Sequence, residues 1–84
     1  MKIVKIGAVW CPGCIVMKKI WGEIEKEYDI ELTSLDIDMD DVTEYNVGST
    51  LPVIIFYKDD TEYKRLVGEK KKSDIVEILD EIKE

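Results

Sequence analysis

Both cysteines of this chain lie in one short stretch, residues 10–14, which reads Trp-Cys-Pro-Gly-Cys. The stretch follows an apolar run over residues 2–9 and precedes residues 15–28, whose apolar positions recur at helical spacing. The two thiols are therefore expected where a strand ends and a helix begins. The first turn of a helix has unpaired N–H groups and the positive end of the helix dipole, so it stabilises a thiolate placed there.

The residues between the cysteines fit this position. Pro12 suits the first turn of a helix, because the N–H group that proline lacks has no partner there. Gly13 leaves the mouth of the site without a side chain. The spacing lets the sulfurs of Cys11 and Cys14 close a small disulfide that opens without unfolding. Next to a strand-helix-strand pattern, the motif predicts a redox-active dithiol.

Other roles for a cysteine pair fit the sequence less well. A zinc site needs about four ligands, and the chain has 2 cysteines and no histidine. A metal or iron–sulfur cluster shared between two chains stays open as an alternative. A purely structural disulfide is weakly supported, because it closes a very short loop and loop-closure stabilisation grows with loop length. We therefore expect no metal and no other cofactor.

Length and charge limit the remaining functions. A chain of 84 residues predicts one domain, residues 1–84, and a net charge of −7 argues against nucleic acid and anionic membranes as partners. No apolar run approaches the ~20 residues that span a bilayer. Lys5 interrupts the first apolar run, and no cleavage site of small residues follows, so we expect no signal peptide. We therefore expect a cytoplasmic protein. We also expect a monomer.

The apolar pattern predicts an α/β order of elements, strand-helix-strand-short helix-strand-strand-helix, forming a small mixed sheet with helices on its faces. The first two strands should be parallel and the last two should form a hairpin. The expected strands are 2–8, 30–38, 53–58 and 62–67, and the expected helices are 12–28, 40–46 and one that Ser73 caps. The first helix should bury Cys14, Met17, Trp21, Ile24 and Tyr28, with Val16 and Ile20 beside them, and the last helix Ile75, Ile78, Leu79 and Ile82.

This order, with Trp-Cys-x-x-Cys after the first strand and Leu51-Pro52 before the third, resembles the thioredoxin family. The likeness covers essentially the whole chain, without the extra N-terminal strand and helix of full-length thioredoxins. Thr50, Leu51 and Pro52 look like the family's cis-proline loop, and Gly68 resembles a glycine near its active site. The resemblance implies a four-stranded sheet of order 2-1-3-4, with the third strand antiparallel to the first, and a cis Leu51–Pro52 bond.

The same resemblance implies thiol–disulfide exchange. Cys11, expected to be the more exposed thiol, would attack a substrate disulfide, and the deeper Cys14 would resolve the mixed disulfide. Trp10 would shield the site, Leu51 would hydrogen-bond a substrate backbone through its main chain, and Pro52 would keep a backbone N–H away from the sulfurs. The implied partners are disulfide-containing proteins and an electron donor similar to thioredoxin reductase.

The chain departs from the family pattern in two places. Thioredoxins commonly have a buried aspartate beneath the second cysteine, and that position is Lys5 here, with Ser34 at the position of its usual lysine partner. Glutaredoxins have a glycine-rich loop for glutathione, whereas Gly68 is followed here by residues 69–72, Glu-Lys-Lys-Lys. We therefore expect a dithiol carrier that reduces protein disulfides rather than a glutathione-dependent reductase. A non-catalytic binding module with the same fold is the third hypothesis.

Lys5 is also a candidate for tuning the second thiol. On a strand expected to be buried on both faces, its ammonium would favour the Cys14 thiolate, whereas an aspartate would disfavour it. The alternative is that Lys5 extends along an apolar stem and places its charge at the surface.

Overall fold

A computed structural model describes residues 2–83 of the chain. Its strands form one sheet in the order β2-β1-β3-β4, in which β1 and β2 are parallel and β3 is antiparallel to both of its neighbours. This confirms the expected four-stranded mixed sheet and its order. The elements are β1 (Lys2–Gly7), α1 (Pro12–Glu27), β2 (Glu31–Asp36), the 3-10 helix η1 (Thr43–Tyr45), β3 (Val53–Lys58), β4 (Thr61–Val67) and α2 (Lys72–Lys83).

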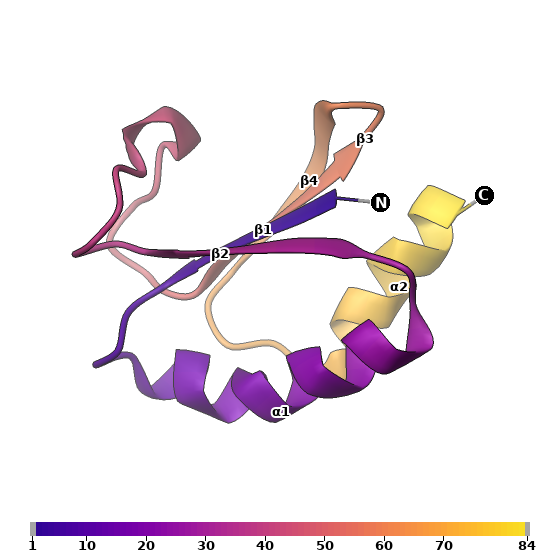
Figure 1. The fold of residues 1–84 in the computed structure, drawn as a ribbon, viewed down its shortest axis with the longest axis horizontal. Helices are drawn as coiled ribbons and strands as arrows, with labels where there is room; N and C mark the ends of the chain where they lie inside the picture. The colour runs from indigo at the N-terminus through magenta and orange to yellow at the C-terminus, as the bar shows by residue number, and fades with distance from the viewer. Residues whose placement is uncertain (1, 84) are drawn as a thin grey trace.

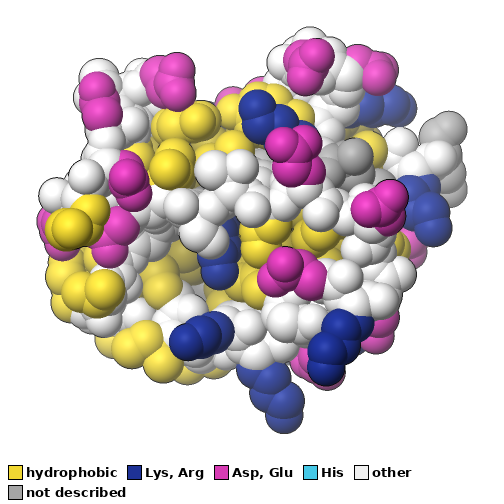
Figure 2. Space-filling view, viewed as in Figure 1, with side chains coloured by type: hydrophobic (Ala, Val, Ile, Leu, Met, Phe, Trp, Pro, Cys, Tyr) yellow, Lys and Arg dark blue, Asp and Glu magenta, His cyan; other side chains and the backbone are white. Residues whose placement is uncertain are grey.

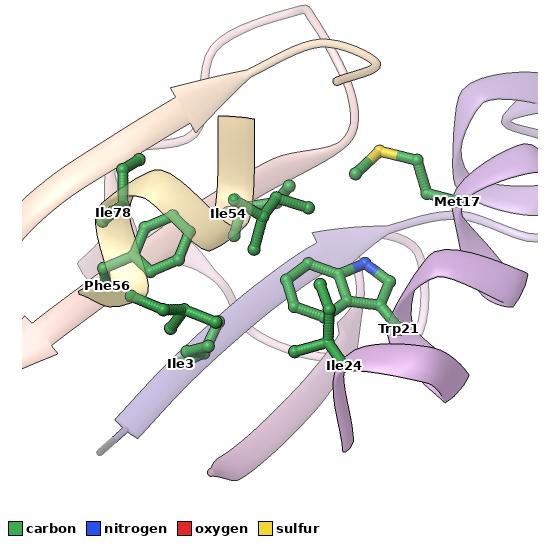
Figure 3. Close-up of a cluster of buried hydrophobic side chains, with 9 residues drawn as sticks. Ile3, Met17, Trp21, Ile24, Ile54, Phe56 and Ile78 are labelled. Atoms are coloured by element: carbon green, nitrogen blue, oxygen red, sulfur yellow. The ribbon is translucent and has the colours of Figure 1, made fainter. Parts of the chain in front are cut away.

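Both α-helices pack against the same face of the sheet, and Figure 1 shows α1 below the strands and α2 to their lower right. Alternate residues of β1 and β3, Ile3, Ile54 and Phe56, point toward the helices and are 0% exposed. Figure 3 shows Met17, Trp21 and Ile24 of α1 facing these strand residues, with Ile78 of α2 beside Phe56. Because these helical positions repeat every three or four residues, they form the apolar stripe that the sequence predicts.

The other face of the sheet has a thinner cover. Val4, Ile6, Val53 and Ile55 are buried there, and the side chains packed over them come mainly from the end of β2 and the connection between β2 and β3. Figure 1 shows this connection, which contains η1, on the side of the sheet opposite the helices. Leu32 of β2 packs on the helical face, whereas Leu35 packs on this one, so β2 contributes apolar side chains to both faces.

One end of the sheet collects the segments that carry the motifs. Gly7 and Asp36, the last residues of the parallel strands β1 and β2, lie opposite each other. Val53, the first residue of β3, pairs with Ile6 on one side and with Val67, the last residue of β4, on the other. The segments 8–11, 37–52 and 68–71 therefore meet at this end, where parallel strands commonly form their sites.

Three local predictions were wrong. Val16 is 56% exposed rather than part of the buried stripe. The helix expected over residues 40–46 is only the 3-10 turn η1, because the Asp41 side chain accepts the Thr43 N–H at 3.0 Å and closes a local turn instead of capping a longer helix. Ser73 does not cap α2, which begins at Lys72; the Asp74 carboxylate instead accepts the Lys71 N–H at 3.1 Å.

Among residues 2–83, no helix has the length and apolar character needed to span a membrane.

Candidate active site

Cys11 is the N-cap of α1, at the junction that the sequence predicts. Its backbone is extended, with φ −84° and ψ 112°, and its sulfur accepts the Cys14 N–H at 3.3 Å. The Cys11 N–H itself donates to the Ala8 carbonyl at 3.1 Å. The Cys11 sulfur therefore lies at the positive end of the helix dipole and pairs with one of the N–H groups that the first turn leaves without a backbone partner.

The relative exposure of the two thiols is the reverse of the prediction. Cys11 is buried, with only 4% of its surface exposed, whereas Cys14 is partly exposed. The physical reason is local: the Cys11 sulfur turns inward over the first turn of α1 to accept an N–H group. Cys14 instead lies on the side of α1 that borders an open cavity. Both cysteines are free thiols.

Cys14 is held in its protonated form. Partial burial raises the pKa of its thiol from the ordinary 9.0 to about 11, and a hydrogen bond with Cys11 acts in the same direction. The Ala8 backbone and the Lys5 charge oppose this increase in pKa. The sulfur lies against the end of β1, where a Cβ on Gly7 would come within 2.7 Å of it. The close approach of Cys14 to β1 therefore depends on glycine at position 7.

The proline loop and the glycine after β4 reach the cysteine motif, as the resemblance implies. The Leu51–Pro52 bond is cis, which confirms that expectation. The Gly68 N–H donates to the Pro52 carbonyl at 2.8 Å, and Gly68 has a φ of +91°, a conformation that side chains disfavour. A Cβ on Gly13 would lie 3.3 Å from both Pro52 and Glu69. Thr50 flanks Gly68, since a Cβ there would lie 3.8 Å from the Thr50 methyl group.

Trp10 is anchored to the segment that follows β2. It is 61% exposed, and its indole Nε1–H donates to a carboxylate oxygen of Asp38 at 2.6 Å. The Asp36 carboxylate in turn accepts the Asp38 N–H at 2.8 Å, so the turn that presents Asp38 is itself ordered. This arrangement fixes the ring at the edge of the cysteine motif.

Lys5 lies on the same face of β1 as Ile3 and Gly7 and is directly opposite Ser34 of β2. Its ammonium nitrogen is 5.8 Å from the centre of the Trp21 ring. Burial lowers the pKa of Lys5, whereas the charges of Glu25 and of a Cys14 thiolate raise it. Lys5 and Cys14 both line a cavity of about 300 Å³ between β1, β2 and α1. The two positions that depart from the family pattern, Lys5 and Ser34, therefore lie side by side in the sheet and line the same cavity as the second thiol.

Large apolar side chains surround the motif at the surface. We call this set the apolar rim; it consists of Val9 (83% exposed), Trp10 (61%), Ile15 (64%), Val16 (56%) and Met39 (83%). Exposed apolar residues are ordinary when scattered, but a group around a concave reactive site is typical of a surface that binds other proteins.

Three residues of the site escaped the sequence reasoning. The expected parallel pairing of the first two strands could have predicted that Asp38 lies near the motif, because the carboxyl ends of parallel strands lie at the same edge of a sheet. Gly7 had a weaker signal, as a glycine at the end of a strand just before the motif. Glu69 was assigned to a solvated loop, and nothing in its spacing indicates that it approaches Gly13. Within residues 2–83, no three His, Cys, Asp or Glu side chains come together as metal ligands would.

Comparisons with known proteins agree with this geometry. A family model described as thioredoxin matches residues 1–81. A thioredoxin of Staphylococcus epidermidis is 30% identical over 95% of this chain and 80% of its own length, and one of Mycobacterium bovis is 30% identical over 95% and 72%. A mutant thioredoxin from Halobacterium salinarum superposes with a TM-score of 0.90 at 16% identity, covering 99% of this chain and 74% of that one. Thioredoxin from Thermosipho africanus gives 0.81 at 23% identity, over 96% and 92%.

Proposed function

Because this chain belongs to the thioredoxin family, we propose that it reduces protein disulfides with Cys11 as the attacking thiol and Cys14 as the resolving thiol. The family identifies it as a thiol–disulfide oxidoreductase; the roles of the individual residues are the proposal. The observation that carries these roles is the hydrogen bond of 3.3 Å from the Cys14 N–H to the Cys11 sulfur at the N-cap of α1.

The proposed reaction has two exchange steps. The Cys11 thiolate attacks one sulfur of a substrate disulfide, forms a mixed disulfide and releases the other substrate sulfur as a thiolate. Cys14 then loses its proton and attacks the Cys11 sulfur, which closes the Cys11–Cys14 disulfide and releases the second substrate thiolate. Two electrons pass to the substrate. Because the Cys14 pKa is about 11, its thiol stays protonated until this second step.

The surroundings of the motif support a protein as the substrate. Cys11 is only 4% exposed, so a disulfide must be drawn against the surface to reach it, and the apolar rim favours such docking. We assign backbone recognition to Leu51, with Thr50, Pro52 and Gly68 forming the wall of the site. Pro52 has no N–H to compete for the sulfurs. Trp10 and Gly13 complete the opening around Cys11.

An electron donor is needed to regenerate the dithiol. We assign this role to a flavoprotein or protein dithiol similar to thioredoxin reductase, which would dock on the same apolar rim. A dithiol that acts in its reduced form requires a reducing compartment, and we propose the cytoplasm.

Lys5 is proposed to support the resolving step. Its ammonium lies in the same cavity wall as Cys14, and its charge lowers the Cys14 pKa against the larger effect of burial. When Cys14 gives up its proton to attack the mixed disulfide, this positive charge stabilises the thiolate that forms. A carboxylate at the same position would act in the opposite direction, although it could accept the proton.

The test is insulin reduction, followed as turbidity, together with a redox titration of the protein. We expect the wild-type chain with dithiothreitol to accelerate precipitation of the insulin B chain, and Cys11→Ser to abolish the acceleration. Activity that depends on glutathione would favour a glutaredoxin-like reductase. A chain that folds but neither catalyses the reaction nor forms its internal disulfide would be a binding module, and the proposal would be wrong.

A further inference from the structure

Glu69 places a carboxylate beside the cysteine motif. A Cβ on Gly13 would lie 3.3 Å from the Glu69 Cβ and 3.6 Å from one of the Glu69 carboxylate oxygens, Oε1. Glu69 follows Gly68, whose N–H donates to the Pro52 carbonyl at 2.8 Å, so the backbone before Glu69 is fixed to the proline loop. Because Glu69 is also exposed, its charge can act on a molecule that binds at the motif.

The distance from this carboxylate to the attacking sulfur has an upper limit. The Cys11 sulfur is 3.3 Å from the Cys14 nitrogen. Three covalent bonds of about 1.3–1.5 Å each join this nitrogen to the Cβ position on Gly13, and the Glu69 oxygen is 3.6 Å from that position. The carboxylate oxygen is therefore within about 11 Å of the sulfur. A charge on a substrate whose disulfide is bound at Cys11 lies within reach of Glu69, because the Debye length is about 30 Å at 0.01 M ionic strength.

The segments around the motif add negative charge rather than offset it. Residues 8–17 include no charged side chain, and the connection 37–52 has three aspartates and one glutamate but no lysine or arginine. Lys5 lines the cavity beside Cys14. Figure 2 shows acidic side chains beside hydrophobic ones at the left end of the molecule, whereas the basic side chains on this face lie nearer its middle and its right. The end of the molecule that carries the motif is therefore both apolar and acidic.

The lysines that follow Glu69 do not neutralise it. Lys70 lines a groove between β4 and α2, Lys71 directly precedes α2, and Lys72 pairs with Glu27 of α1 at 3.0 Å. None of the three forms an ion pair with Glu69 in the part of the chain that the structure describes.

We propose that Glu69 makes the site selective for disulfides flanked by basic residues. This selectivity rests on the proposed function, because it assigns a substrate class to the same two cysteines: proteins and peptides with lysine or arginine beside the disulfide that is reduced. A cationic side chain next to that disulfide is attracted by the Glu69 carboxylate, while apolar neighbours contact the apolar rim. An anionic side chain in the same place is repelled.

Coulomb's law gives the size of the effect. Two unit charges about 11 Å apart in water change a rate by about two-fold, in opposite directions for a cationic and an anionic substrate. The ratio of the two rates contains this factor twice, which makes about four-fold. A change in the reactivity of the Cys11 sulfur itself would alter both rates equally and cancel in the ratio. The ratio therefore reports on substrate recognition.

The experiment compares two peptides that have one internal disulfide and differ only in the residues beside the cysteines, lysine in one and glutamate in the other. Reduced wild-type protein is mixed with each peptide at low ionic strength and the reaction is quenched with acid. Free thiols are then alkylated, and the reduced peptide is quantified by mass spectrometry. Because the two peptides differ in intrinsic reactivity, the ratio of their rates is compared between protein variants.

Glu69→Gln should lower the ratio of the lysine-peptide rate to the glutamate-peptide rate about four-fold, and Glu69→Lys should lower it by more than about ten-fold. Glu23→Gln is the matched control, because it removes the same charge from an exposed position on α1. Glu23 is twelve positions after Cys11, which is about 18 Å at ~1.5 Å per residue, so its ratio should change by less than about two-fold.

Salt provides a check that needs no variant. Raising the ionic strength from about 0.01 M to about 1 M shortens the Debye length from about 30 Å to about 3 Å. The wild-type ratio should then fall toward the value for Glu69→Gln, whereas the ratio for Glu69→Gln should change much less.

An unchanged ratio in Glu69→Gln, an equal fall in Glu23→Gln, or a wild-type ratio that salt does not lower would overturn the selectivity. Each of these results leaves reduction of both peptides, and hence the proposed function, intact. A wild-type protein that reduces insulin but neither peptide would likewise contradict the selectivity alone. A protein that reduces neither insulin nor the peptides would contradict both.

Discussion

Replacing Gly7 by alanine tests whether the sulfur of Cys14 is held against the end of β1. An ideal Cβ at position 7 would lie 2.7 Å from the Cys14 sulfur and 3.4 Å from its Cβ. Favourable contacts between carbon and larger atoms begin at about 3.5 Å, so the sulfur must move by about 0.8 Å from its distance of 2.7 Å. The backbone at Gly7 does not have a positive φ, so the cost comes from this contact and not from the alanine conformation.

The loss of stability in Gly7→Ala depends on how far the Cys14 sulfur can move away from the new Cβ. Overpacking a site typically costs about 1–3 kcal/mol. Because Cys14 is partly exposed and lines a cavity, its sulfur can rotate away, so we expect the lower part of that range, about 1–2 kcal/mol. The same rotation carries the sulfur away from Cys11, so closure of the disulfide should become less favourable.

A double-mutant cycle isolates this contact. Urea unfolding of the reduced protein would be measured for wild type, Gly7→Ala, Cys14→Ala and the double variant. With the sulfur removed, the remaining contact is 3.4 Å, so Gly7→Ala should cost less than about 0.5 kcal/mol. Gly22→Ala is the matched control, because a Cβ there meets nothing within 4 Å. Alanine at this position within α1 should raise the free energy of unfolding by about 0.5–1 kcal/mol.

A coupling between Gly7→Ala and Cys14→Ala that stays within about 0.5 kcal/mol, the usual error of additivity, would refute this reasoning. It would mean that the sulfur occupies another position in solution. Unchanged closure of the disulfide in Gly7→Ala would lead to the same conclusion.

Three further predictions concern charge, protonation and packing. Lys5→Met should raise the Cys14 pKa above about 11 and slow resolution of a mixed disulfide by about three- to four-fold for each unit of pKa. The effect is less than ten-fold per unit because the smaller thiolate fraction is partly offset by the greater nucleophilicity of the thiolate. Stopped-flow measurements would give these rates, and equal rates in the two proteins would leave Lys5 without a role. The folded-state pKa of Cys14 exceeds its ordinary 9.0, so reduced wild type should lose stability relative to Cys14→Ser as pH rises from 9.0 to about 11, measured by urea unfolding; a constant difference would contradict the raised pKa. Leu79→Ala should cost about 2–5 kcal/mol in the same assay because Leu79 is 0% exposed, and a cost below about 1 kcal/mol would contradict its place in the core.

The fold could be predicted from the sequence because its signals are local. The positions Met17, Trp21 and Ile24 repeat at helical spacing, and the apolar run that begins at Val53 forms the strand Val53–Lys58, as expected. A resemblance carried by Leu51-Pro52 then supplied the sheet order and the cis bond, which no local pattern specifies. Helix starts were less predictable, since a side chain such as Asp74 can cap from inside the helix.

The site was only partly predictable, because its finer features depend on contacts between distant segments. The cysteine motif and its place at the start of α1 follow from adjacent residues. The hydrogen bond from Trp10 to Asp38, by contrast, joins residues 28 positions apart. The inversion of exposure between Cys11 and Cys14 depends on which way one sulfur turns within a single helical turn. Sequence spacing does not determine such a rotation.

The most direct test of the account is to trap the mixed disulfide with a protein substrate. Cys14→Ser and Cys11→Ser would each be incubated with insulin, quenched with acid, and analysed by mass spectrometry without reductant. The account predicts a covalent complex through Cys11 in Cys14→Ser and almost none in Cys11→Ser. The reverse pattern, a stable complex through Cys14 alone, would contradict the assignment of Cys11 as the attacking thiol.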